Sequence, residues 1–183
     1  MGIVESLAWL DSHLDHESSS VGVAAGSVDG LGLDTMSELV ALLGDPQSDV
    51  PAIHVTGTNG KGSVTAMVVG LLQAHGLSVG SFTSPHLDRV NERRDGEPID
   101  DQTLSEVLDG LQTIEPLLAT RPSWFELLTA AAFRWFAEAP VDVSVVEVGL
   151  LGRYDATNVV DSQVAVVTGI GGDHTDFSPG WEM

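Results

Sequence analysis

The segment HVTGTNGKGSV, residues 54–64, restricts the possible folds more than any other part of the chain. The apolar run before it, AIHVTG at 52–57, predicts a buried strand, and the apolar stretch 64–76 after it predicts a helix. A glycine-rich turn between a strand and a helix exposes backbone N–H groups at a helix N-terminus, where phosphate binds. The order of strand, loop and helix therefore predicts a phosphate-binding loop. Its glycines are Gly57, Gly60 and Gly62.

Two side chains in this loop fit the same chemistry. Lys61, the only lysine in the sequence, suits the β- and γ-phosphates, and the Ser63 hydroxyl suits Mg²⁺. The spacing differs from G-x-x-x-x-G-K-[ST], because Val55 stands at the first glycine position and Gly62 separates the lysine from the serine. The alternative is a glycine-rich turn with a solvated lysine.

Apolar runs rich in valine alternate with helical patterns along the remaining chain. This alternation predicts an α/β fold with a parallel sheet and helices on both faces. The expected strands are 52–57, 77–84, 141–149 and 162–170. The expected helices are 3–15, a segment capped by Asp34 that ends at Gly44, 64–76, 103–119, and 124–139 with a capping box of Ser123 and Glu126. Residues 86–100 are expected to form a loop. We divide the chain into a helical and loop segment, 1–50, that packs on a sheet-bearing domain, 51–183.

Charge and composition exclude several classes of partner. The formal net charge is −20, from 27 acidic and 7 basic residues, so nucleic acid and anionic lipid are not expected as partners. Without cysteine, the chain has no thiolate site. We read no signal peptide or membrane span in the sequence, and we expect a soluble, cytoplasmic monomer.

Two further segments carry candidate metal ligands. Glu147 ends a predicted buried strand, and strand ends of parallel sheets line ligand crevices. It could hold Mg²⁺, or it could be a buried glutamate that caps a loop. His174, between Asp173 and Asp176, could contact a divalent ion, although such a cluster is more often a surface hydrogen-bonding group.

Four segments together resemble one family. They are TGTNGKGS, SFTSPHLDRVNER, VVEVGLLGRYDATNVV and GIGGDHTDF. In this order they resemble the folylpolyglutamate synthase/dihydrofolate synthase family of the Mur ligase superfamily. The chain departs from the family's pattern at Leu151 and Gly172, where the family has a small and an apolar residue. The resemblance implies the N-terminal, ATP-binding portion of such a ligase, with a P-loop-type three-layer fold (the Mur ligase central domain) that is incomplete at its C-terminal end.

The resemblance also implies a reaction and residue roles. ATP phosphorylates a folate or dihydropteroate carboxylate, and L-glutamate attacks the acyl phosphate to form an amide. Lys61, Glu147 and His174 are then the catalytic residues, and Ser63, Glu147 and His174 hold Mg²⁺. The expected nucleotide-binding residues are Gly57, Thr58, Asn59, Gly60, Lys61, Gly62, Ser63 and Val64. The expected substrate-binding residues are Ser84, Pro85, His86, Arg89, Phe125 and Asp155.

Two alternatives remain open from the sequence. One is a fragment of a Mur-type peptidoglycan ligase, which Gly62 and the SPHL and DATN segments argue against. The other is a non-catalytic nucleotide-binding module, which Leu151 favours. Members of the family continue with more sheet and a separate C-terminal domain, so we expect this chain alone to have little or no ligase turnover.

Overall fold

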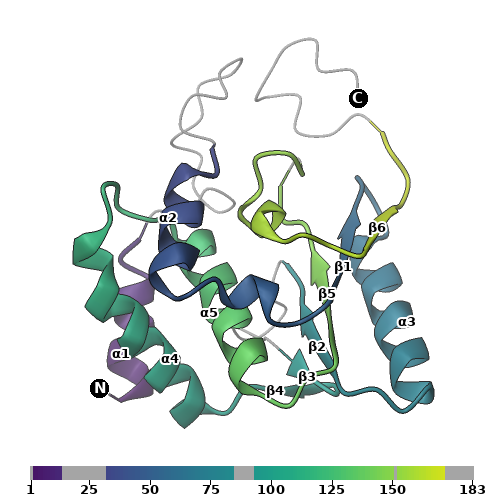
Figure 1. Ribbon diagram of the computed structural model, residues 1–183, viewed down its shortest axis with the longest axis horizontal. Helices are drawn as coiled ribbons and strands as arrows, with labels where there is room; N and C mark the ends of the chain where they lie inside the picture. Colours follow the sequence, from purple (N-terminus) through teal and green to yellow (C-terminus); the bar gives the residue numbers. More distant parts are fainter. Residues whose placement is uncertain (1, 14–31, 85–92, 151, 172–183) are drawn as a thin grey trace.

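The computed structural model describes residues 2–13, 32–84, 93–150 and 152–171, which form a sheet between helices (Figure 1). The strand order is β4-β3-β2-β5-β1-β6. The four parallel strands are β1 (Ala52–Thr56), β2 (Val79–Phe82), β5 (Val143–Glu147) and β6 (Val164–Val167). The short strands β3 (Arg93–Arg94) and β4 (Glu97–Pro98) extend the sheet antiparallel beside β2. The predicted α/β fold is confirmed.

The register of the parallel strands brings their C-terminal ends together. Val55 pairs with Glu147 of β5, and Thr56 pairs with Val167 of β6. The loop that follows Thr56 therefore leaves the sheet beside the end of β5 and the end of β6. This edge carries the candidate site.

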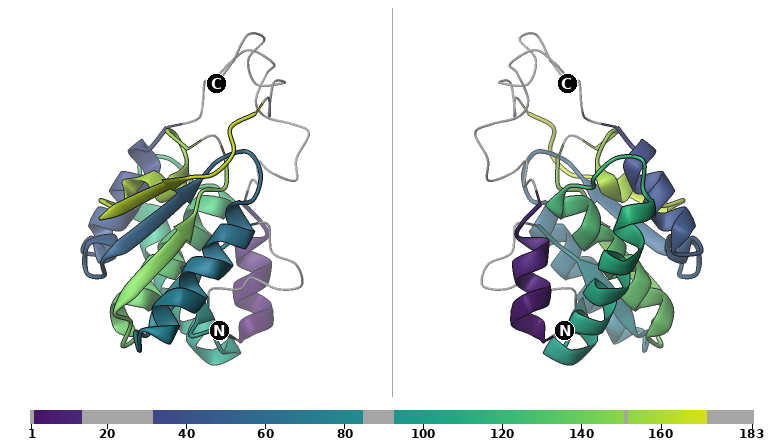
Figure 2. Two further views of the ribbon diagram at one scale, coloured as in Figure 1. Left: turned by 90° about the vertical axis from the view of Figure 1, so that its right-hand side faces the viewer. Right: turned by 90° about the vertical axis from the view of Figure 1, so that its left-hand side faces the viewer.

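Helices cover both faces of the sheet, as the sequence predicted. Helix α3 (Lys61–Ala74) packs Val64, Val68 and Leu72 against valines of β1, β2 and β5. The opposite face packs against α5 (Trp124–Glu138), with α4 (Asp101–Ile114), α1 (Ile3–Leu10) and α2 (Asp34–Leu42) in the same core. Figure 2 shows α1 and α4 on the side away from α3. Of the helices described, none is long and apolar enough to cross a bilayer.

The segment 86–100, expected to be a loop, contains the β3–β4 hairpin, so that expectation was wrong over 93–98. Asp95 and Gly96 both have positive φ, 55° and 88°, as a two-residue turn with left-handed central residues requires. The Asp95 carboxylate also accepts from the backbone N–H of Val79 at 2.8 Å. The Asp-Gly pair is typical of a hairpin turn, but the charged residues on both sides of it lack the apolar pattern that predicts strands.

Helix ends differ modestly from expectation. Helix α1 ends at Leu10, several residues before the expected end, and Asp34 is the first residue of α2, not its N-cap. The capping box of α5 is confirmed, because the Ser123 hydroxyl accepts from the Glu126 N–H at 3.2 Å and the Glu126 carboxylate accepts from the Ser123 N–H at 2.7 Å. Three short 3₁₀ turns were not predicted. They are η1 (Pro46–Ser48), η2 (Glu115–Leu117) and η3 (Ala156–Val159).

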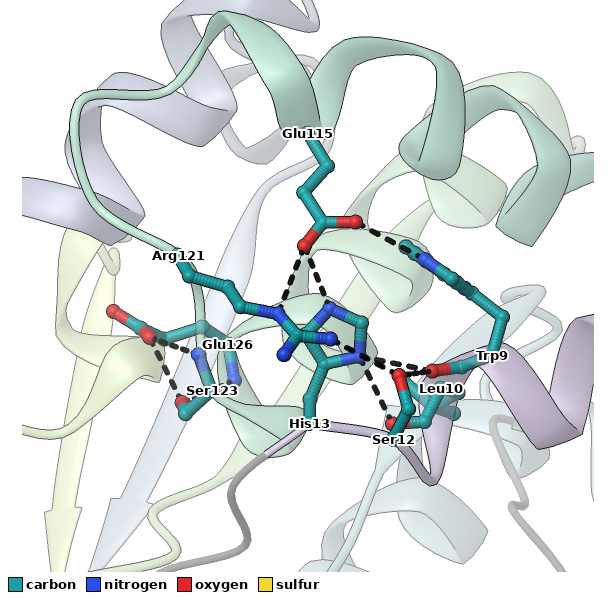
Figure 3. Close-up of polar contacts among 8 residues, drawn as sticks. All are labelled: Trp9, Leu10, Ser12, His13, Glu115, Arg121, Ser123 and Glu126. Carbon is teal, nitrogen blue, oxygen red and sulfur yellow. Dashed lines mark hydrogen bonds and ion pairs between the residues drawn. The ribbon is translucent and has the colours of Figure 1, made fainter.

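A polar network fastens the end of α1 to η2 (Figure 3). The Glu115 carboxylate lies 2.9 Å from Nε2 of His13 and accepts from Nε1 of Trp9 at 3.0 Å and Nε of Arg121 at 3.2 Å. Burial acts to raise the pKa of Glu115, but these hydrogen bonds and the nearby charge hold it below its usual value. Residues of the 1–50 segment are thus tied to the sheet-bearing part, although the proposed domain boundary stays a prediction.

We expect Glu115→Ala to lower the free energy of unfolding by about 2 kcal/mol, because His13 and Trp9 lose a charged acceptor. Since the folded-state pKa of Glu115 is depressed, its contribution is present above the unfolded pKa and is lost as pH falls through the folded pKa. Urea unfolding should show a large difference from wild type at neutral pH and a smaller one in acid. Glu97→Ala, at an exposed position, should change stability by less than about 0.5 kcal/mol. Equal losses of stability in Glu115→Ala and Glu97→Ala would contradict a stabilising role for the Glu115 network.

Candidate functional site

The candidate phosphate loop has the backbone that the sequence predicted. It leaves β1 at Thr56 and enters α3 at Lys61. Gly57 and Gly60 have φ of 136° and 87°, values that residues with a Cβ rarely adopt. Nζ of Lys61 donates to the carbonyl oxygen of Gly57 at 3.0 Å, so the side chain folds back across the loop. Ser63 is exposed in the first turn of α3.

The segment after β6 holds the outer side of this loop. The Thr58 N–H donates to the Gly169 carbonyl at 2.8 Å, and the Thr168 hydroxyl donates to the Asn59 carbonyl at 2.8 Å. A Cβ at Gly57 would lie 2.0 Å from Oγ1 of Thr168. Glycine is therefore required at position 57 by its dihedral angle and by this close approach. Thr168 was not a candidate from the sequence, because nothing local marks its contact with a loop 109 residues earlier.

Glu147 lies at the end of β5 and faces the first turn of α3. Its side chain is 3% exposed, and its carboxylate oxygens lie 3.6 and 3.8 Å from where a Cβ on Gly62 would stand. The glycine after Lys61 thus leaves space beside a carboxylate. Carboxylate and hydroxyl oxygens are ligands that Mg²⁺ accepts, so Glu147 and Ser63 fit a magnesium–nucleotide site.

The third predicted metal ligand, His174, lies outside the described residues. Within the described ranges, no group of three His, Asp or Glu side chains is arranged to hold a metal ion. The structure describes Ser63 and Glu147 of the predicted set, and the metal-binding role of all three residues stays a prediction.

A cavity of about 400 Å³ opens beside the loop at the ends of β1 and β6. Gly57, Thr58 and Lys61 form one part of its wall, and Arg153 and Asn158 form another. Its size and its mix of backbone, cationic and apolar lining suit part of a small ligand. The cavity places Arg153 near the loop, a cation that the sequence had not singled out.

Asp155 is buried and serves the loop that follows β5. Its carboxylate accepts from the N–H groups of Leu150 at 2.7 Å and Thr157 at 3.0 Å, and from the Thr157 hydroxyl. Burial raises the pKa of Asp155, while these hydrogen bonds act in the opposite direction. Thr157 Oγ1 also lies 2.8 Å from Nε2 of His54, whose pKa is lowered by burial. The carboxylate organises its own loop, and its expected contact with substrate stays a prediction.

The other expected substrate-binding residues are only partly within the described ranges. Phe125, in the first turn of α5, is half-buried with its ring centroid 5.7 Å from that of Phe82. Ser84 follows β2 and is half-buried. Pro85, His86 and Arg89 lie outside the described residues, as does Leu151. The structure therefore does not test this group as a set.

Sequence and structure comparisons both find relatives of one kind, folylpolyglutamate and dihydrofolate synthases. No protein-family model matches the chain. It is 46% identical over 161 residues to a dihydrofolate synthase/folylpolyglutamate synthase of Mycobacterium tuberculosis, covering 79% of this chain and 32% of that protein. It superposes on the Mycobacterium tuberculosis folylpolyglutamate synthase complexed with ADP with a TM-score of 0.80 and 38% identity, covering 94% of this chain and 37% of that one.

A complex of a folylpolyglutamate synthase with AMPPCP and folate is also similar, with a TM-score of 0.82, 33% identity, and coverage of 95% and 42%. The chain therefore spans about a third of the length of the curated relative, and about two-fifths of the solved structures.

Proposed function

The chain belongs to the folylpolyglutamate synthase/dihydrofolate synthase family, and on that premise we propose that it is the ATP-binding part of a glutamate ligase. The full reaction joins the amino group of L-glutamate to a carboxylate of dihydropteroate or a folate. The observation that carries the proposal is that a glycine loop at the C-terminal ends of the strands leads into α3 at Lys61, with the Glu147 carboxylate beside Gly62 in the first turn of that helix.

The proposed reaction has two steps. The substrate carboxylate attacks the γ-phosphorus of ATP, which releases ADP and leaves an acyl phosphate. The amino group of glutamate then attacks the acyl carbon, and phosphate leaves as the amide forms. Phosphoryl transfer depends on positioning and charge neutralisation, which a lysine, loop amides and Mg²⁺ supply.

The residues of this chain take part as follows in the proposal. The N–H groups of the loop and the N-terminus of α3 hold the phosphates, and Lys61 moves from the Gly57 carbonyl to the β- and γ-phosphates. Ser63 and Glu147 hold Mg²⁺, which neutralises phosphate charge when it is bound. Because the formal net charge is −20, this local arrangement has to overcome a repulsive surface.

The ligand state of relatives supports the nucleotide part of the proposal. Relatives of this fold were solved with ADP, and with AMPPCP and folate together. We extend ATP and a folate-type substrate to the complete ligase of which this chain is one part. We propose that the chain by itself is a monomer in the cytoplasm. We expect it to bind nucleotide without ligase turnover, because it spans 32% of the M. tuberculosis relative.

Titration calorimetry with ATP and Mg²⁺ tests the proposal. We expect wild type to bind and Lys61→Ala to lose about 10- to 100-fold in affinity, the usual effect of removing a charged hydrogen-bond donor. Arg94→Ala, in the hairpin on the far side of β2, should bind as wild type does. If wild type fails to bind, the proposal is refuted and a scaffold without nucleotide binding remains. If Lys61→Ala binds as tightly as wild type, the nucleotide site at this loop is refuted.

A further inference from the structure

We propose that Thr168 is a positioning residue for nucleotide binding, because its hydroxyl fixes the orientation of one peptide unit in the phosphate loop. Thr168 directly follows β6 and is half-buried. Oγ1 donates to the carbonyl oxygen of Asn59 at 2.8 Å and lies 3.2 Å from that of Thr56. With a single proton to donate, the hydroxyl bonds chiefly to the nearer oxygen, that of Asn59.

The bonded carbonyl belongs to the peptide unit that joins Asn59 to Gly60. In a planar trans peptide the C=O and the N–H point in opposite directions. A carbonyl held toward Thr168 therefore directs the N–H of Gly60 away from Thr168 and away from the segment that follows β6, residues 168–171. Phosphate oxygens accept from such loop N–H groups, so the direction of this N–H matters for binding.

Glycine at position 60 allows this peptide unit to turn over. Gly60 has φ of 87°, and without a Cβ it adopts positive and negative φ about equally readily. A turned-over peptide would present a carbonyl oxygen where the N–H had been, and that oxygen repels phosphate. The Thr168 hydroxyl opposes this change by giving the Asn59 carbonyl a partner on the outer side.

Neighbouring peptide units are held by backbone partners and do not depend on a side chain in the same way. The Thr56 carbonyl accepts from the Thr168 N–H at 2.9 Å, and the Thr58 N–H donates to the Gly169 carbonyl at 2.8 Å. The Thr58 hydroxyl adds a contact with the N–H of Gly171 at 3.0 Å. Asn59 also forms an antiparallel bridge with Gly169, and the Thr168 hydroxyl adds a side-chain bond to the Asn59 carbonyl.

The test compares Thr168→Val, which keeps the shape and removes the hydroxyl, with Thr168→Ser, which keeps the hydroxyl. Titration calorimetry of the full chain would use Mg·ADP and, separately, Mg²⁺ with tripolyphosphate. We expect the valine variant to lose about three- to tenfold in affinity for both probes, and the serine variant to stay within about twofold of wild type. Thermal unfolding without ligand shows whether each variant is folded.

The outcomes separate this inference from the proposed function, on which it rests. If wild type binds neither probe, the proposed function fails first. If wild type binds and Thr168→Val binds equally well, only the role of Thr168 is refuted. The role is also refuted if serine fails to restore affinity, because a shared loss reflects general disturbance of the strand end. A valine variant that is folded, weakened for both probes and rescued by serine supports it.

Discussion

Gly57→Ala should abolish measurable Mg·ATP binding and lower the free energy of unfolding by about 3 kcal/mol, from overpacking and backbone strain together. The added Cβ would lie 2.0 Å from Oγ1 and 3.1 Å from the backbone nitrogen of Thr168. Rotating the hydroxyl away relieves the first contact but not the second, because that nitrogen donates to Thr56 and cannot withdraw without breaking the β1–β6 pairing. The φ of 136° adds strain for any residue with a Cβ.

Gly60→Ala is the matched control for this prediction. Its φ of 87° is also in the positive region, but a Cβ there would meet no atom within 4 Å. Only conformational strain remains, about 1 kcal/mol. Urea unfolding of both variants separates overpacking against Thr168 from backbone strain, and titration calorimetry then measures Mg·ATP binding by each variant. Similar losses of stability in Gly57→Ala and Gly60→Ala would show that the approach of Thr168 does not control the loop.

The features that could be predicted from the sequence are those encoded locally or by simple topology. The apolar runs predicted β1, β2, β5 and β6, and the order of strand, glycines and helix predicted the loop. The proximity of Glu147 to the loop followed from one rule, that parallel strands meet at their C-terminal edge. The register of Val55 with Glu147 realises that rule. The comparisons agree with the family that the motifs suggested.

What could not be predicted depends on contacts between distant segments. The bond from Thr168 to Asn59 joins residues 109 apart, and a threonine at a strand end carries no local sign of such a partner. The motif around Asp155 suggested a substrate contact, which stays a prediction, but it gave no sign that the carboxylate accepts from Leu150 and Thr157 inside its own loop. A motif predicts where in the fold an acidic residue lies, but the groups that its carboxylate contacts depend on the three-dimensional structure.

Glu147→Gln should remove most of the dependence of ATP affinity on Mg²⁺. The carboxylate is buried at the strand end, with its oxygens 3.6 and 3.8 Å from the Cβ position of Gly62, in the turn that carries Ser63. Glutamine keeps the shape and removes the charge that attracts a hard cation. We expect wild type to bind ATP at least about tenfold more tightly with Mg²⁺ than with EDTA, and the variant to show little difference.

The result in EDTA distinguishes a metal ligand from a residue that only packs. Without a cation, a buried carboxylate next to the loop repels a triphosphate, and this repulsion is little screened at a buried position. Glu147→Gln should therefore bind ATP in EDTA as tightly as wild type or more tightly, while it binds more weakly in Mg²⁺. Glu97→Gln, exposed in the hairpin beyond β2, should follow wild type in both conditions. Weaker binding of Glu147→Gln by the same factor with and without Mg²⁺ would show a structural role, because loss of packing does not depend on the cation.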